Sequence, residues 1–346
     1  MQRKELGKSG IFVQPVGMGC WAFGGGAYWG SQPQKDVEAV VHAALERGFT
    51  FFDTAEVYNN GESETALGKA LAGRRAQAVV ASKISPSNAA HVRDHLTASL
   101  KRLGTDYLDI YMLHWPINPL SVRHYSAEKP ERLPEIEDAL GQLAEVKKEG
   151  LIRSIGISNF GLRQMEEVLA AGVQIDLNEI TYNIVSRAIE AEIVPFCAQH
   201  AISIVGSMAL QQGLLTGKYG APEDVPPPQA HSRHFHQSRG GAESRHNEEG
   251  AEAEIFETLT HLKKISDETG YSLSELAIAW VLAKPFIAST LVGCRNISQL
   301  ELNIRACDIT LDADIIRRID EASLPVWKKL GDSPDYYENR KNSRIY

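Results

Sequence analysis

Apolar strand patterns alternate with amphipathic helix patterns along almost the whole chain of 346 residues. Eight such units follow one another without a change in composition, beginning at residues 16–20 and ending at 298–307. Parallel strands require crossover helices of this kind, and uniformly apolar strands indicate a sheet that is covered on both faces. An ordinary open sheet of this type holds about five or six strands. The sequence therefore predicts an α/β fold of a single domain over residues 1–346, a closed (β/α)8 barrel.

The predicted elements are short and are often ended by glycine. The strands are placed at 16–20, 50–52, 78–81, 108–113, 152–157, 174–180, 202–205 and 286–292. The helices that follow them are placed at 34–47, 63–71, 89–103, 133–148, 162–170, 191–200, 253–269 with 274–282, and 298–307. A hairpin over 3–16 precedes the barrel, and an extra C-terminal helix is expected at 312–321. Ser63 is the expected N-cap of its helix, since a hydroxyl can accept a hydrogen bond from a free backbone N–H.

Two segments do not follow the alternation. The insert near 220–250 contains three consecutive prolines at 226–228, followed by a segment rich in His, Ser, Arg and Gly. This composition is typical of a mobile loop, and the sequence leaves open whether the loop is a lid or simply flexible. The tail 325–346 is rich in aromatic residues, and it can either fold over the barrel mouth or form a subunit contact. The sequence does not decide between these two positions, and it leaves the oligomeric state open.

The charge and the cysteines exclude several classes of protein. A net charge of −8 and a pI near 5.8 argue against binding to nucleic acid or to an anionic membrane. No apolar run is long enough to span a membrane, and the first residues lack a signal-peptide core. The four cysteines are far apart, which fits a reducing, cytoplasmic setting. The histidines near residue 234 lack cysteine or carboxylate partners, so no metal site is expected.

Several apolar runs end in a polar or charged residue. Asp53, Lys83 and His114 each come at the end of a predicted strand, and Tyr58 lies on the loop after Asp53. The carboxyl ends of barrel strands meet at one mouth, and active sites of such barrels form there. We therefore expect these four side chains to converge.

These four residue types suit proton transfer to a carbonyl group. A free tyrosine has a pKa of about 10, and a nearby lysine ammonium lowers it. Asp53 can keep Lys83 charged away from water, and a neutral His114 can donate a hydrogen bond to a carbonyl oxygen. Tyr58 then becomes a general acid or base beside a polarised C=O. Because no nucleophile is needed, the electrons have to come from a hydride donor.

Short motifs surround these residues in a fixed order. They are Phe52-Asp53-Thr54-Ala55-x-x-Tyr58, Gly61-x-Ser63-Glu64-x-x-Leu67-Gly68, Leu113-His114-Trp115-Pro116, Ile155-Gly156-x-Ser158-Asn159-Phe160, Gly213-Leu214-Leu215-Thr216-Gly217-Lys218 and Val292-Gly293-Cys294-Arg295-x-x-x-x-Gln299-x-x-x-Asn303. Together they resemble the aldo-keto reductases over nearly the whole chain, and the four residues above resemble that family's catalytic tetrad. The glycine and aromatic loop at 21–30 most resembles bacterial sugar- and aldehyde-type members near the potassium-channel β-subunit branch.

The resemblance implies an NADP(H) cofactor and residues that hold it. Those expected at the nicotinamide are Ser158, Asn159, Glu179 and Ser207; along the pyrophosphate, Gly213, Leu214, Thr216 and Lys218; and at the adenosine and its 2′-phosphate, Gly293, Arg295, Gln299 and Asn303. An arginine suits a phosphate because its planar fork binds pairs of oxygens. The expected lining of the substrate pocket is Trp21, Tyr28, Trp29 and Trp115.

Two of the nicotinamide positions depart from the family pattern. Glu179 stands where a glutamine is usual, and a carboxylate accepts amide hydrogen bonds but cannot donate them. Ser207 stands where a tyrosine usually stacks on the nicotinamide ring. Both differences concern how the nicotinamide is held, and neither changes the tetrad.

The resemblance therefore implies an NADP-dependent oxidoreductase that reduces an aldehyde or ketone, either sugar-like or a small carbonyl, to the alcohol. Two alternatives remain: a cofactor-binding regulatory or sensor subunit on the same fold, and a sugar-modifying enzyme that retains its nucleotide. The barrel-mouth loops decide the substrate, and the sequence conveys their shape least.

Overall fold

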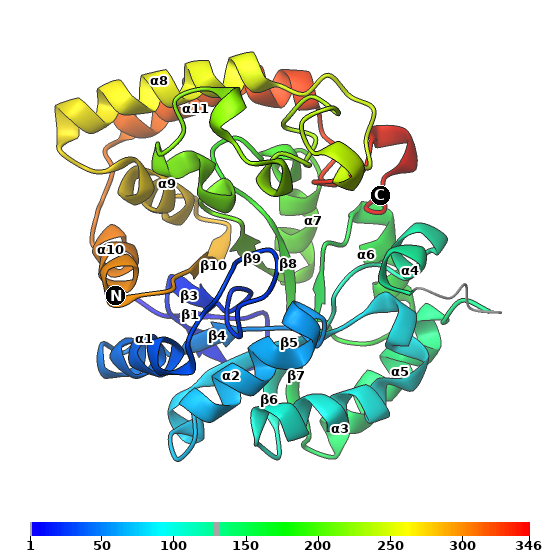
Figure 1. Cartoon of the computed structure of the whole chain (residues 1–346). Helices are drawn as coiled ribbons and strands as arrows, with labels where there is room; N and C mark the ends of the chain where they lie inside the picture. Colours follow the sequence, from blue (N-terminus) through cyan, green and yellow to red (C-terminus); the bar gives the residue numbers. More distant parts are fainter. Residues whose placement is uncertain (1, 127–131) are drawn as a thin grey trace.

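In the computed structural model, which describes residues 2–126 and 132–346, eight parallel strands close into a barrel. Their order around the barrel is β10-β3-β4-β5-β6-β7-β8-β9, so neighbours in sequence are neighbours in space (Figure 1). The strands are β3 (Val16–Gly19), β4 (Phe51–Asp53), β5 (Val79–Ile84), β6 (Leu108–Leu113), β7 (Ile152–Ser158), β8 (Leu177–Thr181), β9 (Ser203–Ser207) and β10 (Ile287–Gly293). The predicted (β/α)8 barrel is confirmed.

Helices form a ring outside the barrel in the described residues (Figure 1). They are α1 (Gln34–Glu46), α2 (Glu62–Ala70), α3 (Val92–Leu103), α4 (Pro119–Tyr125), α5 (Ile136–Lys148), α6 (Leu162–Ala170), α7 (Ile193–His200), α8 (Glu252–Thr269), α9 (Leu273–Leu282), α10 (Ile297–Ala306) and α11 (Ala313–Leu330). The sequence did not predict α4, whose N-terminus is capped by the Asn118 side chain. It also placed the end of α11 too early. No helix in the described residues is long and apolar enough to cross a membrane.

The N-cap of α2 is Gly61, not Ser63 as predicted. Ser63 lies inside the first turn, where its hydroxyl donates to the carbonyl of Cys20 at 2.7 Å and contacts the Thr54 hydroxyl at 2.7 Å. Gly61 takes the left-handed backbone conformation (φ 86°), which costs glycine little. The hydroxyl therefore ties the loops after β3 and β4 together instead of starting the helix.

The predicted hairpin forms from β1 (Lys4–Glu5) and β2 (Phe12–Val13), and it covers the end of the barrel where the strands begin. Lys4 donates to the carbonyl of Ile287 at the start of β10, and the backbone N–H of Gly7 donates to Ser203 at the start of β9. Apolar side chains of the hairpin and the strands fill this end of the barrel. The site must therefore lie at the opposite end.

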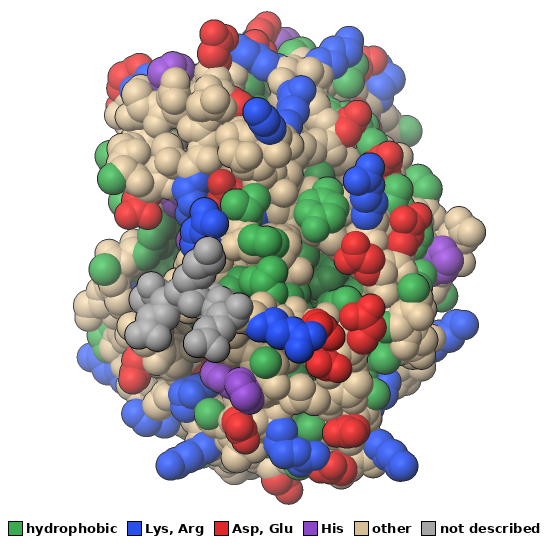
Figure 2. Space-filling model, turned by 90° about the vertical axis from the view of Figure 1, so that its right-hand side faces the viewer, with side chains coloured by type: hydrophobic (Ala, Val, Ile, Leu, Met, Phe, Trp, Pro, Cys, Tyr) green, Lys and Arg blue, Asp and Glu red, His purple; other side chains and the backbone are tan. Residues whose placement is uncertain are grey.

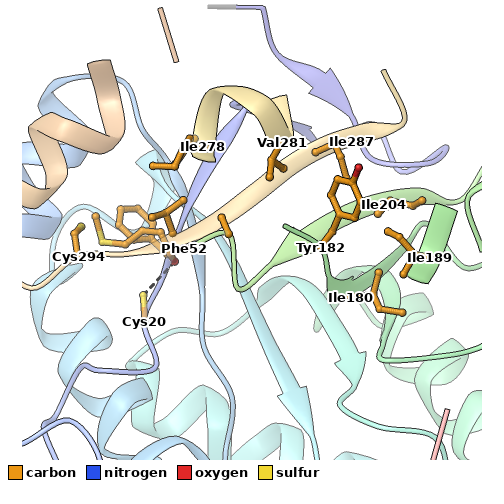
Figure 3. Close-up of a cluster of buried hydrophobic side chains, with 14 of the residues drawn as sticks. Cys20, Phe52, Ile180, Tyr182, Ile189, Ile204, Ile278, Val281, Ile287 and Cys294 are labelled. Carbon is orange, nitrogen blue, oxygen red and sulfur yellow. Dashed lines mark hydrogen bonds between the residues drawn. The ribbon is translucent and has the colours of Figure 1, made fainter. Parts of the chain in front are cut away.

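A second and larger apolar core separates the strands from the helices. Its members include Phe52 from β4, Ile204 from β9 and Ile278 from α9, which point into one buried layer in Figure 3. Strands buried on both faces explain why the sequence shows continuous apolar runs rather than alternation.

The insert and the tail lie against each other. The Arg233 guanidinium from the insert donates to the carbonyls of Leu330, Ser333 and Asp335 at 2.8–3.1 Å. These bonds fix the insert to the end of α11 and to the part of the tail that follows it. Mobility of the insert stays a prediction. On the face toward the right of Figure 1, apolar side chains surround a hollow whose rim is charged (Figure 2).

Candidate active site

The carboxyl ends of the barrel strands bring the predicted tetrad together. Asp53 is the last residue of β4, Lys83 lies near the end of β5, and His114 directly follows β6. The register pairs these strands side by side, so their ends share one mouth.

Tyr58 reaches this mouth from a one-turn helix after β4. The turn depends on Asn59, which has a left-handed backbone (φ 50°) that asparagine tolerates better than most residues. The Asn59 amide donates to the carbonyls of Trp21 and Phe23 at 3.0 and 2.7 Å. Tyr58 is therefore fixed to the aromatic loop of residues 21–30, and its ring lies 5.9 Å from that of Trp21.

The Lys83 ammonium links the other residues of the tetrad. It donates to both carboxylate oxygens of Asp53 at 2.6 and 2.5 Å and to the Tyr58 hydroxyl at 3.4 Å. The Tyr58 hydroxyl also lies 3.5 Å from Nε2 of His114. Asp53, Lys83 and His114 are buried. The phenol therefore faces one cation and one imidazole at the edge of the cavity.

Burial makes the pKa of Tyr58 differ from the sequence-based expectation and keeps His114 neutral, as expected. Burial raises the pKa of the Tyr58 phenol above its ordinary value, although the Lys83 charge opposes this. The expectation of a lowered pKa was therefore wrong in its net direction, because desolvation outweighs the lysine. Burial and the Lys83 charge lower the pKa of His114 well below its ordinary value. At neutral pH the site holds a protonated phenol and a neutral imidazole.

Glu179, in the middle of β8, places a second carboxyl group 3.3 Å from Lys83. Burial by itself lowers the pKa of Lys83, but the charges of Asp53 and Glu179 outweigh it and raise that pKa. Burial and the Asp53 charge raise the pKa of Glu179 to about 8. Asp53 holds the closer contact, so Glu179 is the carboxyl that keeps a proton at neutral pH.

Replacing Glu179 by glutamine is expected to flatten the pH dependence of stability. The pKa of Glu179 is about 8 in the folded protein, above its ordinary value near 4.5, so the folded state holds a proton that the unfolded chain releases. Its contribution is therefore lost as the pH rises from about 4.5 to about 8. Urea unfolding at pH 6 and pH 9 should show a smaller loss in Glu179→Gln than in wild type. Equal losses in wild type, Glu179→Gln and the exposed control Glu249→Gln would contradict this assignment.

A cavity of about 610 Å³ opens above the tetrad. The predicted residues that line it are Trp21, Tyr28, Tyr58, His114, Trp115, Ser158, Asn159, Glu179 and Ser207. Trp29 does not line it, because its ring packs edge-on against Trp21 and Tyr28. The structure thus brings Tyr58 and His114 of the tetrad, the predicted nicotinamide residues and three of the four predicted substrate residues to one cavity, while Asp53 and Lys83 are buried and do not line it.

The residues predicted for the pyrophosphate and adenosine lie outside this cavity. Gln212 and Gly213 both have left-handed backbones, and Thr216 donates to the Gly213 carbonyl at 2.8 Å. The Lys218 ammonium lies close to Gly213, where an added Cβ would come within 2.7 Å of it. Leu214 is buried and contributes to the core.

Gly293 ends β10, and the turn after it leads into α10, which carries Gln299 and the buried Asn303. The Arg295 guanidinium donates to the carbonyls of Trp29 (at 2.7 Å) and Ser31, and to the Gln32 side chain at 2.6 Å. This turn is therefore joined to the aromatic loop.

Sequence reasoning named none of the residues of one wall of the cavity, although it gave the tail over the barrel mouth as one of two possibilities. This wall consists of His124, Tyr125, His231, Arg245, Tyr337 and Arg344, from α4, the insert and the tail. The only sequence signal was the aromatic character of the tail, and no pattern indicates where such a segment packs. In the described residues, no cluster of His, Cys, Asp and Glu could hold a metal ion.

The fold and the site define a (β/α)8 barrel protein with a Tyr-Lys-Asp-His group set for proton transfer at the mouth. The sequence model of the aldo/keto reductase family matches residues 15–324. The chain belongs to the aldo/keto reductase family.

Relatives whose names give different roles match this chain. It is 30% identical to the NADH-specific methylglyoxal reductase of Escherichia coli, over 93% of this chain and 99% of the relative. It is also 30% identical to a probable voltage-gated potassium channel subunit beta of Arabidopsis thaliana, over 89% and 92% of the two chains. The predicted proximity to the channel-subunit branch is confirmed. A solved aldo/keto reductase from Klebsiella pneumoniae, in complex with NADP and acetate, shares the fold with a TM-score of 0.69 at 22% identity, covering 100% of this chain and 99% of that one.

Proposed function

We propose that the protein is an NADP(H)-dependent oxidoreductase that reduces an aldehyde or ketone to the alcohol. One observation carries the proposal: Lys83 joins Asp53 at 2.5–2.6 Å and the Tyr58 hydroxyl at 3.4 Å, at the base of an open cavity. A structural ion pair does not require a phenol beside it at the cavity surface.

The residues around the cavity suit a nicotinamide cofactor. Ser158, Asn159 and Ser207 place hydroxyl and amide groups beside Tyr58 and His114. When bound, the cofactor would supply the hydride.

The chain's own residues would manage the proton and the carbonyl. Tyr58, protonated at neutral pH, would donate its proton to the carbonyl oxygen, and Lys83 would stabilise the phenolate that remains. Asp53 keeps the buried lysine charged. Neutral His114 would donate a hydrogen bond that orients the same oxygen. A protonated phenol favours the reducing direction.

Replacing Arg295 by glutamine is expected to weaken NADPH binding about tenfold and NADH binding much less. Arg295 now bonds to neutral oxygens of residues 29–32, which are weaker acceptors than the 2′-phosphate that only NADPH carries. Dissociation constants from cofactor fluorescence would measure both changes. An equal loss for the two cofactors would show that Arg295 only supports the loop.

The test of the activity is consumption of NADPH or NADH with a panel of small and sugar-like aldehydes and ketones. Stoichiometric formation of alcohol supports the proposal. The channel-subunit relative favours a second candidate, a regulatory subunit on the same barrel, which would bind cofactor with little turnover. A nucleotide retained through purification, with no net consumption, would instead support a sugar-modifying cycle. We propose a reducing compartment such as the cytosol, because Cys20, Cys197, Cys294 and Cys307 are all free thiols.

A further inference from the structure

The tail places a buried arginine in the wall of the cavity. The Arg344 side chain is 1% exposed, and its guanidinium carbon lies 3.6 Å from the centre of the Trp115 ring. Trp115 is next to His114 in sequence, and all three residues line the cavity that Tyr58 also lines. The guanidinium is therefore held flat on an aromatic face within the candidate active site.

The Arg344 guanidinium lacks the hydrogen bonds that a buried arginine normally makes. Its three nitrogens have no hydrogen-bond partner among the described residues. Two carboxylates lie near it, Asp335 at 3.5 Å and Glu338 at 3.6 Å. They balance its charge, but at these distances they do not close hydrogen bonds with it.

Both carboxylates accept shorter hydrogen bonds from other groups. Asp335 accepts the backbone N–H groups of Tyr337, Glu338 and Arg344 at 2.7–3.1 Å. Glu338 accepts from Nε of Arg245 at 2.6 Å. The guanidinium of Arg344, a residue that lines the cavity, thus has two ion-pair partners but no hydrogen-bond acceptor among the described residues, and a buried donor in this state is costly.

The backbone fixes Arg344 in this position. Its carbonyl accepts from the side chains of Asn118 at 3.0 Å and Gln164 at 2.7 Å, so the loop before α4 and the start of α6 hold the tail in place. The site is therefore built into the fold, since three separate segments converge on this residue.

We propose that Arg344 binds an anionic group, a carboxylate or a phosphate, on the carbonyl substrate and so sets the substrate class. Such groups match the guanidinium fork with paired oxygens. The inference rests on the proposed reductase activity. Arg245 adds a second cation on the same wall, and Glu243 lines the same cavity. Selectivity for an anionic substrate therefore comes from the free N–H donors of the Arg344 guanidinium rather than from a net positive charge of the wall.

Matched pairs of probes separate this role from general activity. The carboxylate arm compares 2-, 3- and 4-carboxybenzaldehyde with their neutral methyl esters. The three isomers differ in the distance between the aldehyde carbonyl and the carboxylate. The phosphate arm compares glyceraldehyde 3-phosphate with glyceraldehyde. In at least one arm, wild type should have the higher kcat/KM for the anionic member. Arg344→Gln should lose about 10- to 100-fold there and change little with the neutral member.

Two variants guard against a folding effect. Arg344→Lys keeps the charge without the fork and should lose part of the preference for the anion. Arg93→Gln, at an exposed pair with Glu149, should keep all of it. The inference is overturned if wild type shows no anionic preference in either arm, or if the Arg344 variants slow both members of a pair equally.

A binding measurement separates this inference from the proposed activity. If wild type reduces none of the probes, the proposed function fails, and calorimetry with benzoate and benzamide then decides the role of Arg344. Tighter binding of benzoate in wild type, lost in Arg344→Gln, supports the anion site. Equal binding of the two compounds overturns it.

Discussion

Replacing Tyr58 by phenylalanine is expected to lower kcat for carbonyl reduction by about 10²–10⁴-fold. The change removes a hydroxyl that lies 3.4 Å from Lys83 and 3.5 Å from His114, and it leaves the ring on Trp21. The proton donor is lost while the shape of the cavity is kept. Steady-state kinetics, with cofactor titration by fluorescence, would measure the effect.

A second phenol in the same cavity supplies the control for this experiment. Tyr125 lines the cavity, and its ring lies 5.8 Å from that of His114, but among the described residues its hydroxyl makes no hydrogen bond to Lys83. Tyr125→Phe should therefore keep most of the turnover. Unchanged turnover in Tyr58→Phe, or an equal loss in both variants, would remove Tyr58 from the proposed mechanism.

Replacing Lys83 by methionine is expected to abolish most of the activity and to destabilise the fold by about 3–5 kcal/mol. The ammonium is fully buried, and it lies 2.5 Å from Asp53 and 3.3 Å from Glu179. Without it, two buried carboxyl groups lose their cation. Urea unfolding and kinetics on the same preparation would measure both losses.

The stability loss in Lys83→Met has a predictable pH dependence. Burial without a cation places the carboxyl pKa values of the folded state above those of the unfolded chain, so stability falls as the pH rises from about 4 through the folded values. The loss should be smaller at pH 5 than at pH 8. The exposed control Lys263→Met should show neither effect. A loss that is the same at both pH values would mean that the carboxylates have other partners.

The barrel and the tetrad were predictable because both follow from local sequence patterns. Repeated strand-helix units determine a closed parallel sheet, and such a sheet gathers its carboxyl ends at one mouth. Asp53, Lys83 and His114 occupy those ends, so their convergence follows from the topology. Tyr58 is close in sequence to Asp53, which limits how far its loop can carry it.

Two features were not predictable in the same way: the cavity wall formed by α4, the insert and the tail, and the pKa shifts within the site. Arg344 reaches Trp115 across more than two hundred positions, and irregular segments have no periodicity that could indicate such a contact. The net direction of the Tyr58 pKa depends on how completely the fold removes water from it. Ser63 has the residue type of a cap, but it lies close enough to Cys20 to bond there instead.

Transfer of deuterium from NADPH labelled at C4 of the nicotinamide tests the central claim most directly. Mass spectrometry of the alcohol formed from a reduced aldehyde would locate the label, with a sample lacking protein as the control. The proposed function predicts one deuterium on the former carbonyl carbon, in proportion to the NADPH consumed. Binding of NADPH without label transfer to any carbonyl of the panel would contradict it and would favour a regulatory protein on this barrel.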